Sequence, residues 1–145
     1  MDFFQRMQDA KGTGNFTAVI DEIPYAKLLG MQIEEGEDDA LTFIMPFLTS
    51  NIGNPALPAL HGGVIGGFME TAALLHLIWA QESRELPRTV DFSLDYLHSG
   101  KPETLYAKCT ITKKGRRIAN VAITAWQESP DKPVAVARAH VLLIE

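Results

Sequence analysis

The feature that most constrains this sequence is its longest hydrophobic run, which extends from Val64 to Ala80. Glu70 is the only charged residue in this run, and His76 is the only other ionisable side chain. Because removing a carboxylate from water is costly, Glu70 indicates either a hydrogen-bonded buried group or a functional one. The run reaches about the lower length limit for a membrane span. Glycines in its first turns and Glu70 at its centre instead favour a buried helix over residues 62–83.

The length and composition of the chain favour one soluble domain spanning residues 1–145. Its net charge of −5 argues against a nucleic-acid-binding protein, which needs a basic face. A single cysteine, Cys109, excludes an intramolecular disulfide and suits a reducing compartment. Cys109 also lies in a strand-like alternation, which favours a core residue over a nucleophile. The N-terminus lacks the pattern of a signal peptide, so we predict a cytoplasmic protein with no membrane partner.

Two segments flank the expected core before the hydrophobic run. Residues 1–30 form a predicted helical extension, with helical spacing over 2–11 and 17–29 and an interruption at Pro24. Residues 47–60 form a long loop rich in Asn, Pro and Gly that leads directly into the helix. Loops of this length without regular structure are disproportionately functional.

The remaining segments have the alternation of β-strands. Short turns between the last strands imply antiparallel hairpins. In the first strand after the helix, Val90, Phe92, Leu94 and Tyr96 share one face. A sheet wrapped around one central helix buries such a helix economically, so we predict an α+β fold. The predicted strands are residues 31–35, 40–46, 88–98, 105–114, 116–128 and 134–144, and an acidic turn over 35–39 separates the first two.

The glycines at the start of the predicted helix are candidates for a chemical role. Glycine lets a ligand approach the backbone, where the free N–H groups at a helix N-terminus favour negative charge. The amides of Gly62 and Gly63 are therefore candidate donors to a carbonyl oxygen that becomes an oxyanion. Paired glycines can equally serve close packing of the helix on a sheet.

The spacing of Gly62 and Glu70 constrains any site that uses both. They are eight residues apart, which is about 12 Å along a helix. One carbonyl group cannot contact both within a single helix, because each contact must be near 3 Å. Two antiparallel helices would bring Gly62 of one subunit to Glu70 of the other. An active site built on these residues therefore predicts a homodimer interface.

Three sequence motifs together resemble a known family. These are Asn-Ile-Gly-Asn at 51–54, His-Gly-Gly-(six residues)-Glu-Thr-Ala at 61–72, and Thr-Val-Asp-Phe-Ser-Leu-Asp-Tyr-Leu at 89–97. The pattern looks like the hotdog-fold acyl-CoA thioesterases, specifically the phenylacetate-pathway (PaaI-like) branch, over roughly residues 28–145. The resemblance implies an antiparallel sheet wrapped around one long central helix. It also implies homodimers joined edge to edge, often paired into homotetramers, and thioester hydrolysis without a metal or any cofactor beyond the CoA of the substrate.

The resemblance also implies roles for individual residues. Glu70 matches the catalytic acid, which would act as general base or as nucleophile. Gly62 matches the glycine whose amide polarises the thioester carbonyl, and His61 would orient the start of the helix. Relatives carry an Asn near the attacking water shortly before His-Gly-Gly. Here Asn51 and Asn54 are both candidates, with Asn54 slightly favoured, because residues 55–60 lengthen the loop.

The remaining site assignments concern the substrate and its surroundings. Thr89 matches a Ser or Thr that helps to hold the site in some members. A substrate-binding role is assigned to Gly63 at the helix start, and to Arg116 and Arg117, which could contact a CoA phosphate or simply lie in an exposed hairpin turn. Four further residues suggest an apolar or aromatic acyl group: Phe47, Leu48, Phe68 and Met69.

Two alternative functions remain on the same fold. A hydratase or dehydratase of acyl thioesters would need a catalytic His near the acid. The only helical candidate is His76, which lies six residues from Glu70 and therefore on the opposite side of the helix. A non-catalytic protein that binds acyl-CoA or assembles with a partner is disfavoured by the presence of both Glu70 and Gly62.

Overall fold

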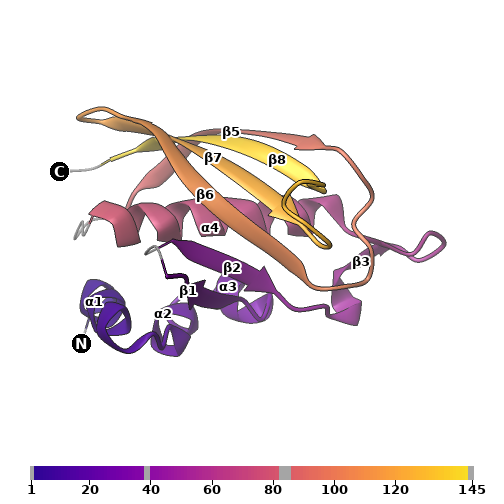
Figure 1. Cartoon of the computed structure of the whole chain (residues 1–145), viewed down its shortest axis with the longest axis horizontal. Coiled ribbons are helices and arrows are strands. Elements are labelled where there is room, and N and C mark those ends of the chain that lie inside the picture. Colours follow the sequence, from indigo (N-terminus) through magenta and orange to yellow (C-terminus); the bar gives the residue numbers. More distant parts are fainter. Residues whose placement is uncertain (1, 38–39, 82–85, 144–145) are drawn as a thin grey trace.

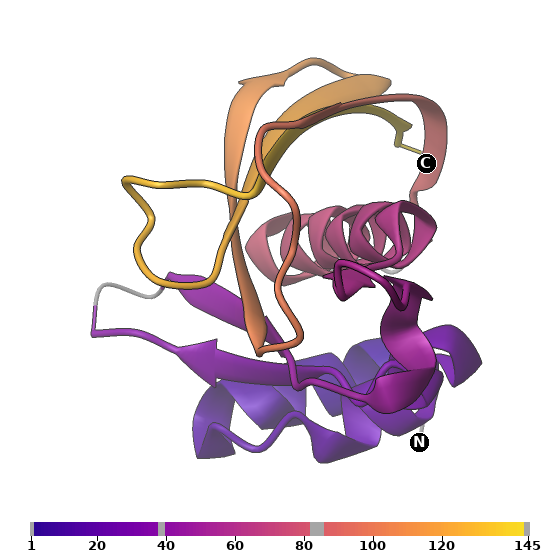
Figure 2. The ribbon, with the colours of Figure 1, turned by 90° about the vertical axis from the view of Figure 1, so that its right-hand side faces the viewer.

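The architecture is built around α4 (Gly62–Gln81), the long central helix. The computed structural model describes residues 2–37, 40–81 and 86–143 (Figure 1). A curved sheet wraps around α4 and leaves one side of the helix uncovered by strands (Figure 2). This arrangement confirms the predicted hotdog fold. The predicted helix end near Ser83 lies outside the described residues.

The sheet has six strands, and every neighbouring pair is antiparallel. The segments predicted as strands all form strands, with ends that differ by a few residues. The first strand after the helix lies at an edge of the sheet, where its one neighbour is the last strand of the chain. In spatial order the strands are β1 (Gln32–Glu35), β2 (Leu41–Met45), β6 (Leu105–Lys114), β7 (Ile118–Trp126), β8 (Ala135–Leu142) and β5 (Arg88–Tyr96).

Small residues on the inner face of the sheet allow it to approach α4. The inner positions of β7 and β8 are fully or almost fully buried, whereas their alternate positions are more exposed. Alanine at many of these positions removes side-chain volume between the sheet and the helix, and the larger residues of α4 fill the space between them. The inner residues are Ala119, Val121, Ile123, Ala125, Ala135, Ala137, Ala139 and Val141.

A β-bulge in β5 changes which residues of that strand face α4. The register shifts between Thr89 and Asp91, so one extra residue is inserted opposite β8. Thr89 pairs with Val141 on the inner face, and Val90 is 58% exposed. The expectation that Val90 shares the inner face with Phe92 was therefore wrong, because strict alternation does not anticipate a bulge.

The segment 47–60 is more ordered than the predicted irregular loop. It contains a short 3-10 helix, η1 (Thr49–Asn51), and a small hairpin of β3 (Ile52–Asn54) and β4 (Ala59–Leu60). The Asn54 side-chain oxygen accepts hydrogen bonds from the backbone N–H groups of Ala56 and Leu57, which stabilises the turn between the two strands. Strands this short leave little periodic signal in a sequence.

Three N-terminal helices cover part of the side of α4 that the sheet leaves open (Figure 1). Near the end of α4, Phe16 packs on Trp79 with ring centroids 5.6 Å apart. Nearer its start, the Tyr25 side chain lies against Gly67. The helical extension is thus placed along the helix that carries Glu70. Its helices are α1 (Phe3–Thr13), α2 (Thr17–Asp21) and α3 (Pro24–Leu28).

Candidate active site

The first turn of α4 leaves one backbone donor unused. The Gly63 N–H donates to Nδ1 of His61 at 2.9 Å, and the N–H groups of Val64 and Ile65 donate to the His61 carbonyl oxygen. The Gly62 N–H makes no hydrogen bond with any residue that the structure describes. Of the two predicted donors, only Gly62 is therefore available to a ligand. Because Nδ1 of His61 accepts a hydrogen bond, the neutral ring carries its proton on Nε2.

The segment before α4 also fixes the position of the His61 backbone. The His61 N–H donates to the Asn51 carbonyl oxygen at 2.8 Å. A Cβ atom added to Gly53 would lie 2.6 Å from Cα and 2.8 Å from Cβ of His61, so only glycine permits this close approach. The position of the helix start is therefore set by η1 and β3.

Tyr96 completes the support of the helix start, and sequence reasoning assigned it no site role. Its hydroxyl donates to the Gly62 carbonyl oxygen at 2.7 Å. The peptide that joins Gly62 to Gly63 is thus bonded at both ends, by Tyr96 at the carbonyl and by the His61 ring at the amide. The signal for it was available, because Tyr96 follows Phe92 and Leu94 on the inner face of a strand next to the helix.

Glu70 lies on the face of α4 that the sheet does not enclose. It is half-buried and makes no hydrogen bond or ion pair with any described residue. Leu94 of β5 lies against Gly66 on one side of this face, and Tyr25 of α3 lies against Gly67 on the other. Glu70 is therefore accessible, at the edge of an apolar core, without a partner among the residues that the structure describes.

The structure separates the two candidate asparagines. Asn54 is exposed, and its side-chain oxygen is already used in the turn of the β3–β4 hairpin. Asn51 is only 6% exposed, and its side-chain nitrogen has no hydrogen-bond partner within the described chain. Asn51 also contacts the helix start through its carbonyl bond to His61. An unused buried donor beside the helix start makes Asn51 the better candidate for a site residue.

Thr89 has a similar unsatisfied group. Its hydroxyl is buried without a hydrogen-bond partner in the described structure. Tyr96 lies at Gly62 and Leu94 lies at Gly66, so β5 runs antiparallel to α4. Thr89 therefore lies toward the far end of the helix, beyond the level of Glu70. It is close to neither Gly62 nor His61 of its own chain.

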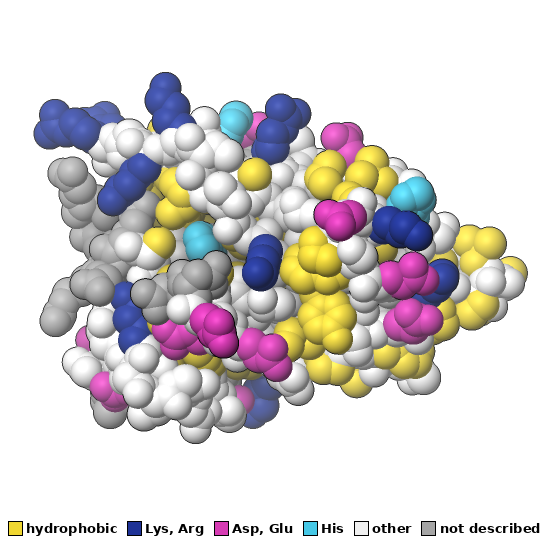
Figure 3. All heavy atoms as spheres, in the orientation of Figure 1, with side chains coloured by type: hydrophobic (Ala, Val, Ile, Leu, Met, Phe, Trp, Pro, Cys, Tyr) yellow, Lys and Arg dark blue, Asp and Glu magenta, His cyan; other side chains and the backbone are white. Residues whose placement is uncertain are grey.

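Two further pairs of predicted substrate-binding residues lie in very different surroundings. Phe68 and Met69 are completely buried in the core of the folded chain, and their contact with an acyl group stays a prediction. Arg116 and Arg117 are exposed in the turn between β6 and β7. That turn lies near the end of α4 opposite its start (Figure 1), where several Lys and Arg side chains lie at the surface (Figure 3).

Burial shifts the pKa of two other described groups, His76 and Cys109, and neither shift suits a catalytic role. Burial lowers the pKa of His76, and its Nδ1 has no described hydrogen-bond partner, so the ring is neutral at pH 7. Burial raises the pKa of the Cys109 thiol, which keeps it protonated and a poor nucleophile. Within residues 2–37, 40–81 and 86–143, no group of His, Cys, Asp and Glu side chains is arranged to hold a metal ion.

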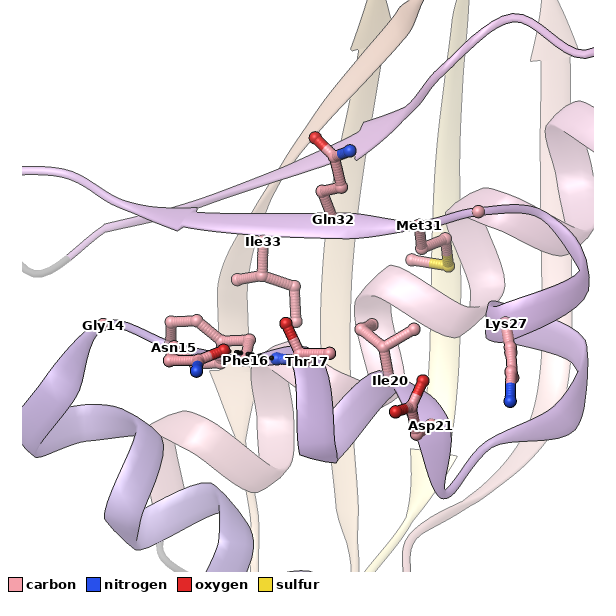
Figure 4. A pocket seen from close by; sticks show the side chains of 11 residues that line it. Gly14, Asn15, Phe16, Thr17, Ile20, Asp21, Lys27, Met31, Gln32 and Ile33 are labelled. Carbon is pink, nitrogen blue, oxygen red and sulfur yellow. Dashed lines mark hydrogen bonds between the residues drawn. The ribbon is translucent and has the colours of Figure 1, made fainter.

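Two pockets differ in their relation to this centre. One of about 350 Å³ lies at the helix start and is lined by Gly62, Tyr96 and residues 97–100 among others. Another of about 380 Å³ lies between the N-terminal helices and β1, where Ile33 points toward α2 and Gln32 points to the opposite side of the strand (Figure 4). None of the predicted site residues lines this second pocket. Of these two pockets, only the one at the helix start has Gly62 in its lining.

The length and composition of α4 over Gly62–Ala80 would also allow it to cross a membrane. Its position inside the curved sheet, with the large apolar side chains in the core, explains the same composition (Figure 2). The predicted buried helix accounts for the hydrophobic run.

Comparison with known proteins decides the family. A sequence model of the thioesterase superfamily matches residues 57–134, which is more than half of the chain and includes α4 and β5–β7. The chain belongs to the thioesterase superfamily. This confirms the predicted family and the predicted enzyme class, a thioesterase. The N-terminal helices lie outside the matched residues.

Individual relatives of this thioesterase cover most of its length. The medium/long-chain acyl-CoA thioesterase YigI of Escherichia coli is 28% identical over 110 residues, covering 67% of this chain and 71% of YigI. A solved structure from Chromobacterium violaceum is 51% identical, with a TM-score of 0.80, and covers 97% of this chain and 98% of that one. A phenylacetic acid degradation-related protein of Ralstonia eutropha shares the fold, with a TM-score of 0.76, 20% identity and coverage of 98% and 100%.

Proposed function

We propose that this thioesterase hydrolyses an acyl-CoA thioester to a free acid and CoA, at a site shared by two subunits. The observation that carries the proposal is the hydrogen bonding in the first turn of α4. The Gly63 N–H donates to the His61 ring, whereas the Gly62 N–H has no acceptor among the described residues. Glu70 supplies a carboxylate on the open face of the same helix, and this carboxylate has no partner among the described residues. The name of the Escherichia coli relative supports a medium- or long-chain acyl-CoA as substrate.

In the proposed reaction, the Gly62 N–H donates to the thioester carbonyl oxygen and stabilises the negative charge that forms there. Glu70 either removes a proton from a water molecule as its oxygen attacks the carbonyl carbon, or attacks that carbon itself. In the first case the C–S bond breaks and the CoA thiolate leaves and takes up a proton. In the second, Glu70 displaces the CoA thiolate as the C–S bond breaks, the thiolate takes up a proton, and water then hydrolyses the acyl-Glu70 anhydride to the free acid and the Glu70 carboxylate. Both routes give the same products.

The spacing of the two groups requires the second subunit. Gly62 and Glu70 lie about 12 Å apart along one helix. The free edge of β5 supports an antiparallel pairing of two copies, and Val90 and Leu97 at that edge are 58% and 47% exposed. Since β5 is antiparallel to α4, two antiparallel β5 strands would also place the two α4 helices antiparallel. Gly62 of one subunit would then face Glu70 of its partner.

The same dimer accounts for the more distant residues. The end of α4 with Arg116 and Arg117 would lie toward the partner's helix start, where the two guanidinium groups could meet a CoA phosphate. Asn51, with its unused buried nitrogen, would hold the attacking water, and Thr89 would support the Glu70 side of the site. Pairing of dimers into tetramers, a cytoplasmic location and a reaction without metal belong to the same proposal.

The test is release of free thiol from short, medium-chain, long-chain and aromatic acyl-CoAs. Glu70→Gln keeps the size of the side chain and should lower kcat by about 10²–10⁴-fold. Gly62→Pro deletes the amide donor, whereas Gly62→Ala keeps it and serves as the matched control for added bulk against Tyr96. Full activity of Glu70→Gln would refute the mechanism, and CoA binding without any release would favour a non-catalytic binding protein.

A further inference from the structure

We infer that Tyr25 of α3 forms a wall of the acyl pocket and limits the size of the acyl group that the enzyme accepts. The inference rests on the proposed function, because it takes Glu70 as the point where the thioester carbon lies. It extends that function to the N-terminal helices, which lie outside residues 57–134 that match the family.

The first step is the contact between Tyr25 and α4. A Cβ atom added to Gly67 would lie 2.6 Å from the Tyr25 hydroxyl oxygen, 2.8 Å from Cε2 and 3.1 Å from Cζ. The tip of the ring therefore rests directly on the backbone of α4. Glycine at position 67 is what allows it to come this close.

The second step is the position of Glu70 relative to this contact. Residues three apart on a helix are neighbours, with Cβ positions about 5–6 Å apart. Gly67 and Glu70 have this spacing, so the ring of Tyr25 lies one turn before the carboxylate on the same face. An acyl group that extends from Glu70 toward Gly67 would therefore contact the ring.

The third step is the shape of this open face. Leu94 lies over Gly66 and Tyr25 lies over Gly67. The two side chains therefore cover the part of this face that lies between Gly62 and Glu70. Tyr25 is 40% exposed, and its hydroxyl has no hydrogen-bond partner among the described residues. The ring is thus presented at the surface of the site and is not enclosed in the core. Phe68 and Met69 are fully buried, whereas the Tyr25 ring is partly exposed.

The experiment compares kcat/KM across saturated acyl-CoAs of increasing chain length. Removing the ring in Tyr25→Ala should enlarge the pocket and raise the ratio of long-chain to short-chain kcat/KM by about 10-fold or more. Tyr25→Phe should keep the wild-type profile, because the proposed wall is the ring. Leu28→Ala is the matched control, since Leu28 lies on the same helix and is 70% exposed.

A second variant tests the contact itself. Gly67→Ala places a methyl group against the ring and should push Tyr25 into the pocket, lowering kcat/KM for every substrate. The double variant Gly67→Ala/Tyr25→Ala should recover activity relative to Gly67→Ala, because the clashing ring is gone. Melting temperatures of all variants would separate pocket effects from unfolding, and Tyr25→Leu provides a second truncation of the ring.

The outcomes distinguish this inference from the proposed function. Loss of activity in Glu70→Gln together with an unchanged chain-length profile in Tyr25→Ala and Tyr25→Leu would overturn only the role of Tyr25. Full activity of Glu70→Gln would overturn the proposed function and this inference with it. A shifted profile in Tyr25→Ala, with Leu28→Ala unchanged and Glu70 still required, would support both.

Discussion

Replacing Gly53 by Ala tests whether the hairpin before α4 sets the position of His61. The new Cβ would lie 2.6 Å from Cα and 2.8 Å from Cβ of His61. Carbon atoms at optimal contact are about 3.5–4.0 Å apart, so the backbone of β3 or of the helix start must move by roughly 1 Å. A backbone atom cannot rotate away as the end of a long side chain can.

The expected cost is that of overpacking, about 1–3 kcal/mol of unfolding free energy. For a domain of this size, that corresponds to a fall in melting temperature of roughly 2–12 °C. The movement should also shift the Gly62 amide, since His61 immediately precedes it, and lower kcat for thioester hydrolysis. Thermal unfolding and thiol release should be measured at one protein concentration, because dimerisation makes the melting temperature concentration-dependent.

Gly12→Ala is the matched control for Gly53→Ala. Gly12 lies in α1, and a Cβ added there would meet no atom within 4 Å. Alanine in a helix is favoured over glycine, so this variant should be stabilised by about 0.5–1 kcal/mol without a change in kcat. If Gly53→Ala were as stable and as active as the wild type, the inferred support of His61 by β3 would be wrong.

Three further predictions concern single groups. Tyr96→Phe removes the hydrogen bond to the Gly62 carbonyl and should cost about 1 kcal/mol of stability and lower kcat, as measured by urea unfolding and thiol release. Burial lowers the pKa of His76 from 6.5, so below pH 6.5 the unfolded chain binds more protons than the folded chain. The free energy of unfolding should therefore be highest above pH 6.5 and fall as the pH drops below it. The urea midpoint of His76→Leu should depend less on pH in that range. Burial raises the pKa of the half-buried Cys109 thiol, so iodoacetamide should label it far more slowly in the native protein than after unfolding, and fast labelling of the native protein would contradict the raised pKa.

The sequence was sufficient for the main features of the fold because they depend on long patterns. The hydrophobic run of α4 and the alternation of six strands each extend over enough residues to identify the element. The bulge at Val90 was not predictable from alternation, because one inserted residue changes the face without changing the composition. The β3–β4 hairpin was missed for a similar reason, since its strands are too short to show a period.

The candidate site was predictable where chemistry depends on residue type, and less so where it depends on contacts. The single Glu in the apolar helix and the pair of glycines at the helix start can be read directly from the sequence. The availability of Gly62 in preference to Gly63 depends on the direction of the His61 ring, and the burial of Asn51 depends on the hairpin. The contact of Tyr25 with Gly67 joins segments more than forty residues apart, so no local pattern could predict it.

The central claim is that one site combines Gly62 of one subunit with Glu70 of the other, and a mixed dimer tests it most directly. Subunits with Glu70→Gln and subunits with Gly62→Pro, each carrying a different affinity tag, would be co-expressed and the heterodimer purified through both tags. If the sites are shared, one site of the heterodimer contains an intact Gly62 and an intact Glu70, while the other carries both defects. We predict about half of the wild-type kcat per dimer, from two parents that are each inactive. A heterodimer as inactive as its parents would contradict a shared site.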